Sequence, residues 1–154
     1  MSRALVVTLA AGAICALAVP RAHAASSPPS RIEAIEKITS MTGPATGSAG
    51  PRQGDSLAYT STMSDRQGRR LGSGAGQCMV IAVRAGKISH LECNGSYSLP
   101  GGYLMLTGPV DPTSRARQHN VIVGGTGRYA GARGVEDFTF RSADTAVETL
   151  RISR

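Results

Sequence analysis

The first candidate for chemistry in this 154-residue chain is a glycine-rich segment near its C-terminal end. Residues 121–123 form an apolar run that leads into Gly125-x-Gly127-x-x-Ala130, the order of a dinucleotide-binding fingerprint. That fingerprint needs a following helix, whose N-terminus faces the pyrophosphate, and a second strand that ends in an acidic residue. Residues 131–134 read Gly-Ala-Arg-Gly, which would break a helix, and no βαβ pattern follows them. The sequence therefore predicts no nucleotide site here.

Two cysteines form the second candidate. Cys78 and Cys93 flank a local turn signal, Ala85-Gly86, and a two-residue hairpin turn at that position would place Arg84 opposite Lys87. The same register places the two thiols directly opposite each other, so the sequence predicts a disulfide bond. A longer turn would leave the thiols diagonal to each other, and a free reactive cysteine is the alternative.

The other polar residues predict neither a metal site nor a hydrolase. His90 and His119 have no neighbours at metal-ligand spacing, and no serine lies in a nucleophile-elbow sequence. His90 lies two residues from Glu92, and we expect it to have a structural role. The 17 Lys and Arg residues, against 10 Asp and Glu, are scattered and lack stacking aromatic neighbours, which argues against nucleic-acid binding. We expect no metal and no cofactor.

The N-terminal segment has the three parts of an export signal. Arg3 supplies the positive start, Leu5 to Val19 form an uncharged apolar stretch, and Ala22-His23-Ala24 supplies small residues for cleavage. This stretch is shorter than the roughly 20 residues of a membrane-spanning helix, so we expect a signal peptide over residues 1–24 and no stable membrane anchor. Cleavage after Ala24 would give a secreted protein, and because Arg3 and Arg21 leave, its net charge falls from +7 to +5.

The rest of the chain divides into residues 25–53 and a β-rich domain over residues 54–154. Arg31 to Thr39 fits neither a helical nor a strand period, and residues 41–53 are rich in Gly, Pro, Ser and Ala, which is typical of a flexible connector. From residue 54 the pattern predicts short strands separated by glycine-rich breaks at 72–76, 100–102 and 124–127. The predicted strands lie at Leu57–Met63, Met79–Val83, Ile88–Tyr97, Tyr103–Thr107, Asn120–Val123, Val135–Phe140 and Val147–Ile152. This pattern favours an all-β sandwich or barrel.

Several of these motifs occur together in one known family. Gly54-Asp55, Gly76-Gln77-Cys78, Gly108-Pro109 and the block from Gly124 to Gly134 resemble the allene oxide cyclase and dirigent protein superfamily. The last block is the most specific, because a Gly-Gly-Thr-Gly turn followed by an aromatic residue and Ala-Arg-Gly is typical of dirigent proteins. The resemblance implies an eight-stranded antiparallel β-barrel with a hydrophobic interior, often trimeric. It also implies that residues 31–38 form the first strand.

The resemblance transfers only part of the family's catalytic set to this chain. Glu33 stands where plant allene oxide cyclases have a catalytic glutamate on the first strand, but the asparagine two positions on is Ile35. A second asparagine is replaced by Ser61 and the tyrosine after Gly-Pro by Val110, while the family's cysteine is present as Cys78. Without the asparagines that would hold an ordered water, cyclisation of a fatty-acid allene oxide is not expected.

Three interpretations of function remain open. The barrel could bind a small hydrophobic molecule and direct a cofactor-free cyclisation or stereoselective coupling by shape, with Glu33 as catalytic acid, base or charge stabiliser. It could be a non-catalytic secreted binding protein, or a structural protein with a filled interior. For the two binding interpretations we expect ligand contacts from Tyr59, Ser61, Tyr97 and Val110, and a homotrimer or homodimer is the expected assembly.

Overall fold

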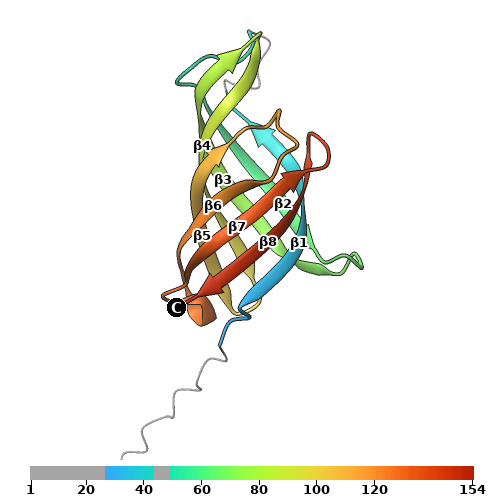
Figure 1. Cartoon of the computed structure of the whole chain (residues 1–154), viewed down its shortest axis with the longest axis vertical. Coiled ribbons are helices and arrows are strands. Elements are labelled where there is room, and N and C mark those ends of the chain that lie inside the picture. Colours follow the sequence, from blue (N-terminus) through green and yellow to red (C-terminus); the bar gives the residue numbers. More distant parts are fainter. Residues whose placement is uncertain (1–26, 44–48) are drawn as a thin grey trace, which may run out of the picture.

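The computed structural model describes residues 27–43 and 49–154. The expected signal peptide lies outside the described residues, as does part of the expected connector. Eight β-strands and one short 3₁₀ helix account for most of the described chain (Figure 1). They are β1 (Arg31–Thr42), β2 (Ser56–Ser64), β3 (Arg70–Arg84), β4 (Lys87–Leu99), β5 (Gly102–Val110), β6 (Gln118–Gly125), η2 (Gly127–Tyr129), β7 (Arg133–Phe140) and β8 (Thr145–Ser153).

Each strand pairs antiparallel with the next one along the chain, and β1 also pairs with β8, so the sheet closes into a barrel. Closure leaves no unpaired sheet edge around the body of the barrel. The eight-stranded antiparallel β-barrel is thus confirmed. The first strand runs four residues beyond the expected end at Ile38, because Ser40, Met41 and Thr42 continue the ladder with β2 after a bulge.

The β3–β4 hairpin extends beyond the other strands at one end of the barrel (Figure 1). Its turn has positive φ at Ala85 (50°) and Gly86 (72°), as a two-residue type I′ turn requires. Arg84 therefore pairs with Lys87, and Cys78 pairs with Cys93. Two register shifts between Val80 and Val83 cancel each other, so the predicted register holds at the cysteines. The predicted disulfide bond is present between them.

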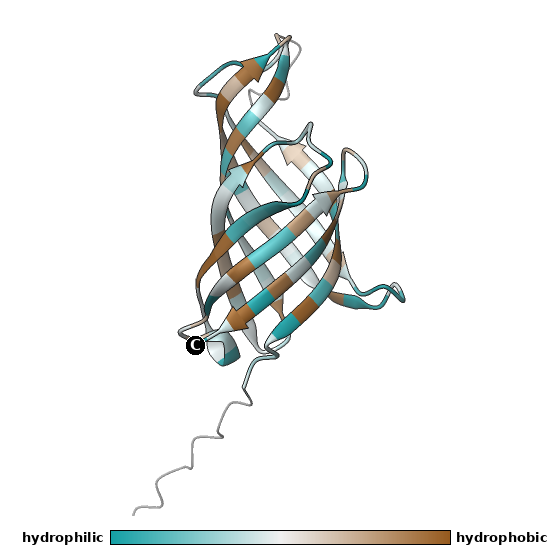
Figure 2. Cartoon of the chain, viewed as in Figure 1, coloured by the Kyte–Doolittle hydropathy of each residue, from teal (hydrophilic) through white to brown (hydrophobic). Residues whose placement is uncertain are grey.

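Side chains alternate between the interior and the outside along each strand, which Figure 2 shows as alternating bands of hydropathy. The glycine-rich segment 72–76 was predicted to interrupt the strands, but β3 runs straight through it. Gly72, Gly74 and Gly76 are spaced two residues apart and line one face of the strand. A Cβ built on each would lie less than 3 Å from an atom of a neighbouring strand. Close approach, not chain reversal, therefore explains these glycines.

The interior is built in layers along the barrel axis. One end is filled by an apolar cluster that includes Met63, Leu104, Ile122 and Leu150, together with Tyr129 from η2. A second apolar cluster, which contains Leu57, Val80, Leu91 and the disulfide, lies on β2, β3 and β4. The interior also holds buried polar side chains, which are described below. The described part of the chain contains no helix long and apolar enough to cross a membrane.

Candidate functional site

A pocket of about 100 Å³ occupies the barrel interior on the side of the second apolar cluster. Met41, Pro112 and Ala143 line it from the end of β1, the β5–β6 loop and the β7–β8 loop, so the pocket opens at that end of the barrel. Its apolar walls come from most strands of the barrel. They include Ile38, Leu57, Leu91, Val110, Phe138 and Phe140, with the Cys78–Cys93 bridge beside them.

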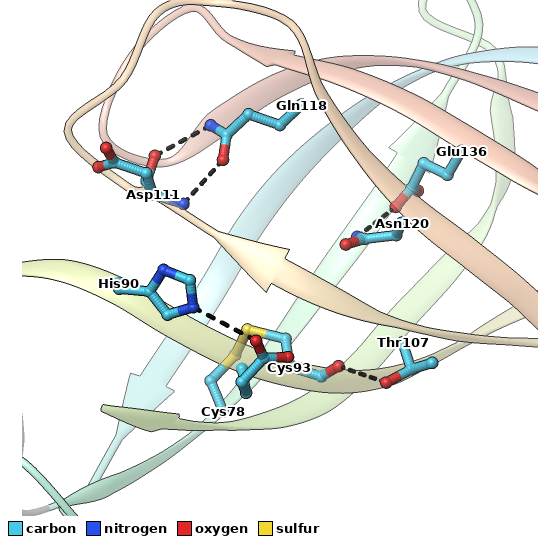
Figure 3. The surroundings of a disulfide bond; sticks show 9 residues. Cys78, His90, Cys93, Thr107, Asp111, Gln118, Asn120 and Glu136 are labelled. Carbon is cyan, nitrogen blue, oxygen red and sulfur yellow. Dashed lines mark hydrogen bonds and ion pairs between the residues drawn. A yellow bond between two sulfur atoms is a disulfide. The ribbon is translucent and has the colours of Figure 1, made fainter. Parts of the chain in front are cut away.

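Three glutamates form the polar floor of this pocket. Glu36 on β1, Glu136 on β7 and Glu148 on β8 all line it, and each is at most 9% exposed. The Asn120 side-chain amide donates to Glu136 Oε2 at 2.7 Å, which Figure 3 shows in the surroundings of the disulfide. The Ser61 hydroxyl donates to Glu36 Oε1.

Tyr97 on β4 connects two of the glutamates. Its hydroxyl oxygen lies 2.7 Å from Glu136 Oε1 and 3.2 Å from Glu148 Oε1. A phenol carries a single proton and can donate to only one carboxyl at a time. Tyr97 donates along the shorter contact to Glu136, and the proton of Glu148 is directed at Glu36, with which Glu148 forms a further side-chain hydrogen bond. The two carboxyls then form a chain in which Glu148 holds the proton and Glu136 carries the charge.

The surroundings of the two carboxyls agree with a proton on Glu148 and a charge on Glu136. Burial raises the pKa of Glu136 to about 7, against its ordinary value of 4.5, although the hydrogen bonds from Tyr97 and Asn120 oppose the shift. Burial, the charges of Glu136 and Glu36, and a hydrogen bond to Glu36 raise the pKa of Glu148 well above 4.5, although the hydrogen bond from Tyr97 opposes the shift. Burial and the same carboxylates raise the pKa of Tyr97, which therefore stays protonated. At neutral pH Glu136 is the group poised to exchange a proton.

Inward-facing glycines make room for these polar side chains. A Cβ on Gly74 would lie 2.3 Å from Ser61 Oγ and 2.8 Å from Glu36 Oε1. A Cβ on Gly95 would lie 2.8 Å from the Tyr59 hydroxyl, and one on Gly108 would lie 2.5 Å from Asn120 Oδ1. The glycines of β3, β4 and β5 thus leave space that the polar side chains occupy.

Most residues expected to contact a ligand lie at or beside this pocket. Tyr59, Tyr97 and Val110 line it, and Ser61 is buried next to it on Glu36. Burial, followed by the charge of Glu36, raises the pKa of the Tyr59 hydroxyl.

Glu33, the candidate catalytic residue, does not join this group. Its carboxylate is on the outside of β1, bonded to Arg31 at 2.7 Å and to Arg66 at 3.1 Å, and the side chain is 38% exposed. The hydrogen bond from Arg31 and the charges of both arginines lower the pKa of Glu33. It is a solvated ion pair, away from the pocket.

The alternation of residues along the strands could have predicted that the three glutamates point into the barrel. In a barrel strand, residues two apart face the same side. Glu136 therefore points to the same side of β7 as Phe138 and Phe140. Glu148 points to the same side of β8 as Ala146, Leu150 and Ile152. An acidic residue on the apolar face of an amphipathic strand is costly to bury unless it has partners, and it marks a candidate site. Glu36 meets the same criterion between Ala34 and Ile38, whereas Glu33 has the opposite parity.

The two histidines lie outside the pocket. His90 contacts Glu92 at 3.3 Å on the surface, and His119 bonds to Asp137 on the outer face of β6 and β7. Over residues 27–43 and 49–154, no group of three or more His, Cys, Asp or Glu side chains is arranged to hold a metal ion.

The fold and this interior define a class of protein, and comparison with known sequences gives its family. The family model described as allene oxide cyclase barrel like domain matches residues 35–151. The chain belongs to this family. Comparison with curated protein sequences gives no significant match.

Solved structures with the same barrel include three of different activity. A pyocyanin demethylase superposes with a TM-score of 0.66 at 21% identity, covering 80% of this chain and 99% of that one. An exo-specific intermolecular Diels-Alderase gives 0.60 at 13% identity, with 80% and 98% coverage. A pterocarpan synthase dirigent protein gives 0.61 at 17% identity, with 79% and 81% coverage. At these identities the likeness shows the shared fold.

Proposed function

We propose that this barrel binds a small apolar molecule and catalyses its isomerisation or cyclisation by proton transfer between the molecule and a carboxyl of the pocket floor. One observation carries the proposal: Glu136, with a pKa of about 7, is linked through Tyr97 to a second buried carboxyl, Glu148, at the bottom of an apolar pocket. A pair of titratable groups whose protonation differs at working pH is the usual arrangement for acid–base catalysis.

The chemistry follows from the order of protonation. The apolar part of a substrate would pack against Leu57, Leu91 and Phe138, with its polar atom toward the floor. Ionised Glu136 would remove a proton from a carbon next to a carbonyl, and the O–H of Glu148 would hydrogen-bond the resulting enolate oxygen. Glu136 would then return the proton to another carbon, so that the substrate is isomerised with no net gain or loss. Such acid–base assistance typically contributes 10²- to 10⁴-fold.

The structural neighbours support a small-molecule role for this fold. They are a pyocyanin demethylase, an intermolecular Diels-Alderase and a pterocarpan synthase dirigent protein. Because fold does not determine function, the weight of the proposal rests on the glutamates of this chain.

A small isomerisation tests the proposal. 3-Cyclohexen-1-one is a neutral six-membered ring whose conversion to 2-cyclohexen-1-one needs only a base and a hydrogen-bond donor. We expect saturable catalysis, followed by ultraviolet absorbance, with a rate that rises as pH passes through about 7 because Glu136 ionises there. Glu136→Gln should lower kcat at least 10-fold, since the amide cannot accept the proton.

Two controls separate the alternatives. Glu92→Gln removes an exposed carboxyl on the outside of β4 and should leave the rate unchanged. Val110→Trp should block the pocket, whereas Ile81→Trp adds similar bulk on the outer face of β3 and should not. Loss of turnover in Glu33→Gln but not in Glu136→Gln would move the site to the surface. Saturable binding of the ketone without turnover would favour the non-catalytic binding protein.

Export and self-association are part of the proposal. The disulfide bond supports an oxidising, extracytoplasmic location, as does the export signal expected in residues 1–24. Exposed apolar side chains on the outer faces of β5 and β6, namely Tyr103, Met105, Val121 and Val123, support assembly into a homodimer or homotrimer.

A further inference from the structure

The pocket has an unbalanced set of charged groups. Glu36, Glu136 and Glu148 line it, but among the described residues no lysine, arginine or histidine does. The other polar side chains of its lining are Tyr59, Tyr97 and Asn120, which are neutral. An ionised carboxylate in such surroundings is costly without a cation beside it. Nothing in the lining supplies that cation.

The floor also has more free hydrogen-bond acceptors than free donors. The donors of Tyr97 and Ser61 are already directed at the glutamates, and so is the Asn120 amide. Two buried oxygen atoms, Glu148 Oε2 and Asn120 Oδ1, accept no hydrogen bond from a donor side chain, and the further hydrogen bond of Glu148 is to another carboxyl, that of Glu36. Both residues line the pocket. The floor therefore has spare acceptors and spare negative charge, which is the complement of a charged N–H donor.

We infer that the pocket also binds, in competition with the ketone of the proposed function, an apolar ring carrying a protonated amine whose N–H groups bind at Glu136 and Glu148, and that it excludes carboxylate ligands. The inference rests on the proposed function in one respect, that the pocket is the ligand site. An ammonium group would satisfy the free acceptors and balance the charge of Glu136. A carboxylate head would add a further negative charge to a buried cluster that already holds three acidic groups.

The size of the pocket limits the apolar part. Its volume of about 100 Å³ is somewhat smaller than the roughly 150 Å³ cavity that admits benzene in an engineered protein. The pocket is open at the mouth, between Met41, Pro112 and Ala143, so one ring fits with its edge toward the opening. A single ring with a one-carbon arm to the amine is therefore the probe of choice.

Three one-ring probes differ mainly in the charge of the head group: benzylamine, benzyl alcohol and benzoate. At pH 8 we expect calorimetric titration of the mature, oxidised protein to give a benzylamine Kd at least 10-fold below that of benzyl alcohol. Benzoate should give no saturable heat. Glu136→Gln should weaken benzylamine at least 10-fold while leaving benzyl alcohol within about 2-fold, and the surface control Glu92→Gln should change neither.

A pH titration of the unmodified protein provides a second test that needs no variant. The titratable groups facing Glu136 are Glu36 from β1, Tyr59 from β2, Tyr97 from β4 and Glu148 from β8. The tyrosines stay neutral over the range, so protonation of the carboxyls dominates. Lowering the pH from 8 to 5.5 should weaken benzylamine at least 10-fold and leave benzyl alcohol nearly unchanged.

The outcomes distinguish this inference from the function on which it rests. If benzyl alcohol binds as tightly as benzylamine, or benzoate binds tighter than either, the ammonium inference is wrong and the proposed pocket stands. If none of the three probes binds, both the inference and the proposed ligand site fail. Equal loss of benzylamine and benzyl alcohol binding in Glu136→Gln would mean that the variant has damaged the pocket, and the pH titration then decides alone.

Discussion

Glu136 and Asp137 are adjacent on β7 and have opposite environments. Glu136 faces the interior, where burial raises its pKa to about 7. Asp137 faces outward between His119 and Arg151; burial alone would raise its pKa, but hydrogen bonds and charges from those two side chains lower it. Two carboxyls of similar intrinsic acidity thus differ because alternate strand residues face opposite sides.

Gly74 should be intolerant of even one methyl group. Its Cβ position lies 2.3 Å from Ser61 Oγ and 2.8 Å from Glu36 Oε1, so Gly74→Ala must displace the polar floor. We expect a loss of about 1–3 kcal/mol in the free energy of unfolding, measured by urea denaturation. Adding Ser61→Ala removes the nearest atom and should recover part of the loss. A Gly74→Ala protein as stable as the unmodified one would show that the floor is loosely packed.

The sequence identified some of the residues that line the pocket but not the three glutamates of its floor. Tyr59, Tyr97 and Val110 were expected to contact a ligand and do line the pocket. Glu33 was chosen by its place in a family pattern, whereas the facing of each strand selects Glu36. That facing could not be assigned for β1, because the isoleucines at 32, 35 and 38 follow neither a helical nor a strand period. The bulge between Ile38 and Ser40 shifts the pairing with β2 by one residue.

At the scale of the element, the β3–β4 hairpin is the best determined part of the fold from sequence. A two-residue turn with positive φ at both central positions sets the register, and the register places the cysteines opposite each other. The same hairpin contains the clearest error, the break expected at residues 72–76. Glycine marks both turns and close backbone approach, and only the neighbouring strands decide between them.

Removing the disulfide should cost stability with little change of fold. The bridge closes a segment with a sequence separation of 15, for which loop-closure entropy predicts a contribution of about 3 kcal/mol. The variant Cys78→Ala with Cys93→Ala should therefore unfold at lower urea, with near-unchanged far-ultraviolet circular dichroism. Reductant should shift the unmodified protein to the same midpoint and leave the variant where it is. Equal midpoints for the oxidised protein and the variant would contradict the prediction.

At the scale of the whole molecule, the barrel combines a filled end with an open one. The cluster around Met63, Leu104 and Leu150 packs the end that η2 closes, and this packing supports the buried carboxyls above it. Those carboxyls oppose folding when ionised, because each charge has left water without gaining a cation. The site is therefore maintained at the expense of stability, as is common where function needs perturbed ionisable groups.

This conflict predicts how the stability of the whole barrel depends on pH. The folded state holds a proton on Glu136 up to about pH 7, whereas the unfolded chain releases it near 4.5, so the contribution of Glu136 to stability is fully present below 4.5 and is lost as pH rises to about 7. The difference amounts to about 3 kcal/mol, and Glu148 extends the fall to higher pH. Thermal melts from pH 5 to 8 should show a decreasing Tm. Glu136→Gln with Glu148→Gln should flatten the profile and Glu92→Gln should not, whereas a Tm that rises toward pH 8 would show that the carboxyls are ionised and solvated.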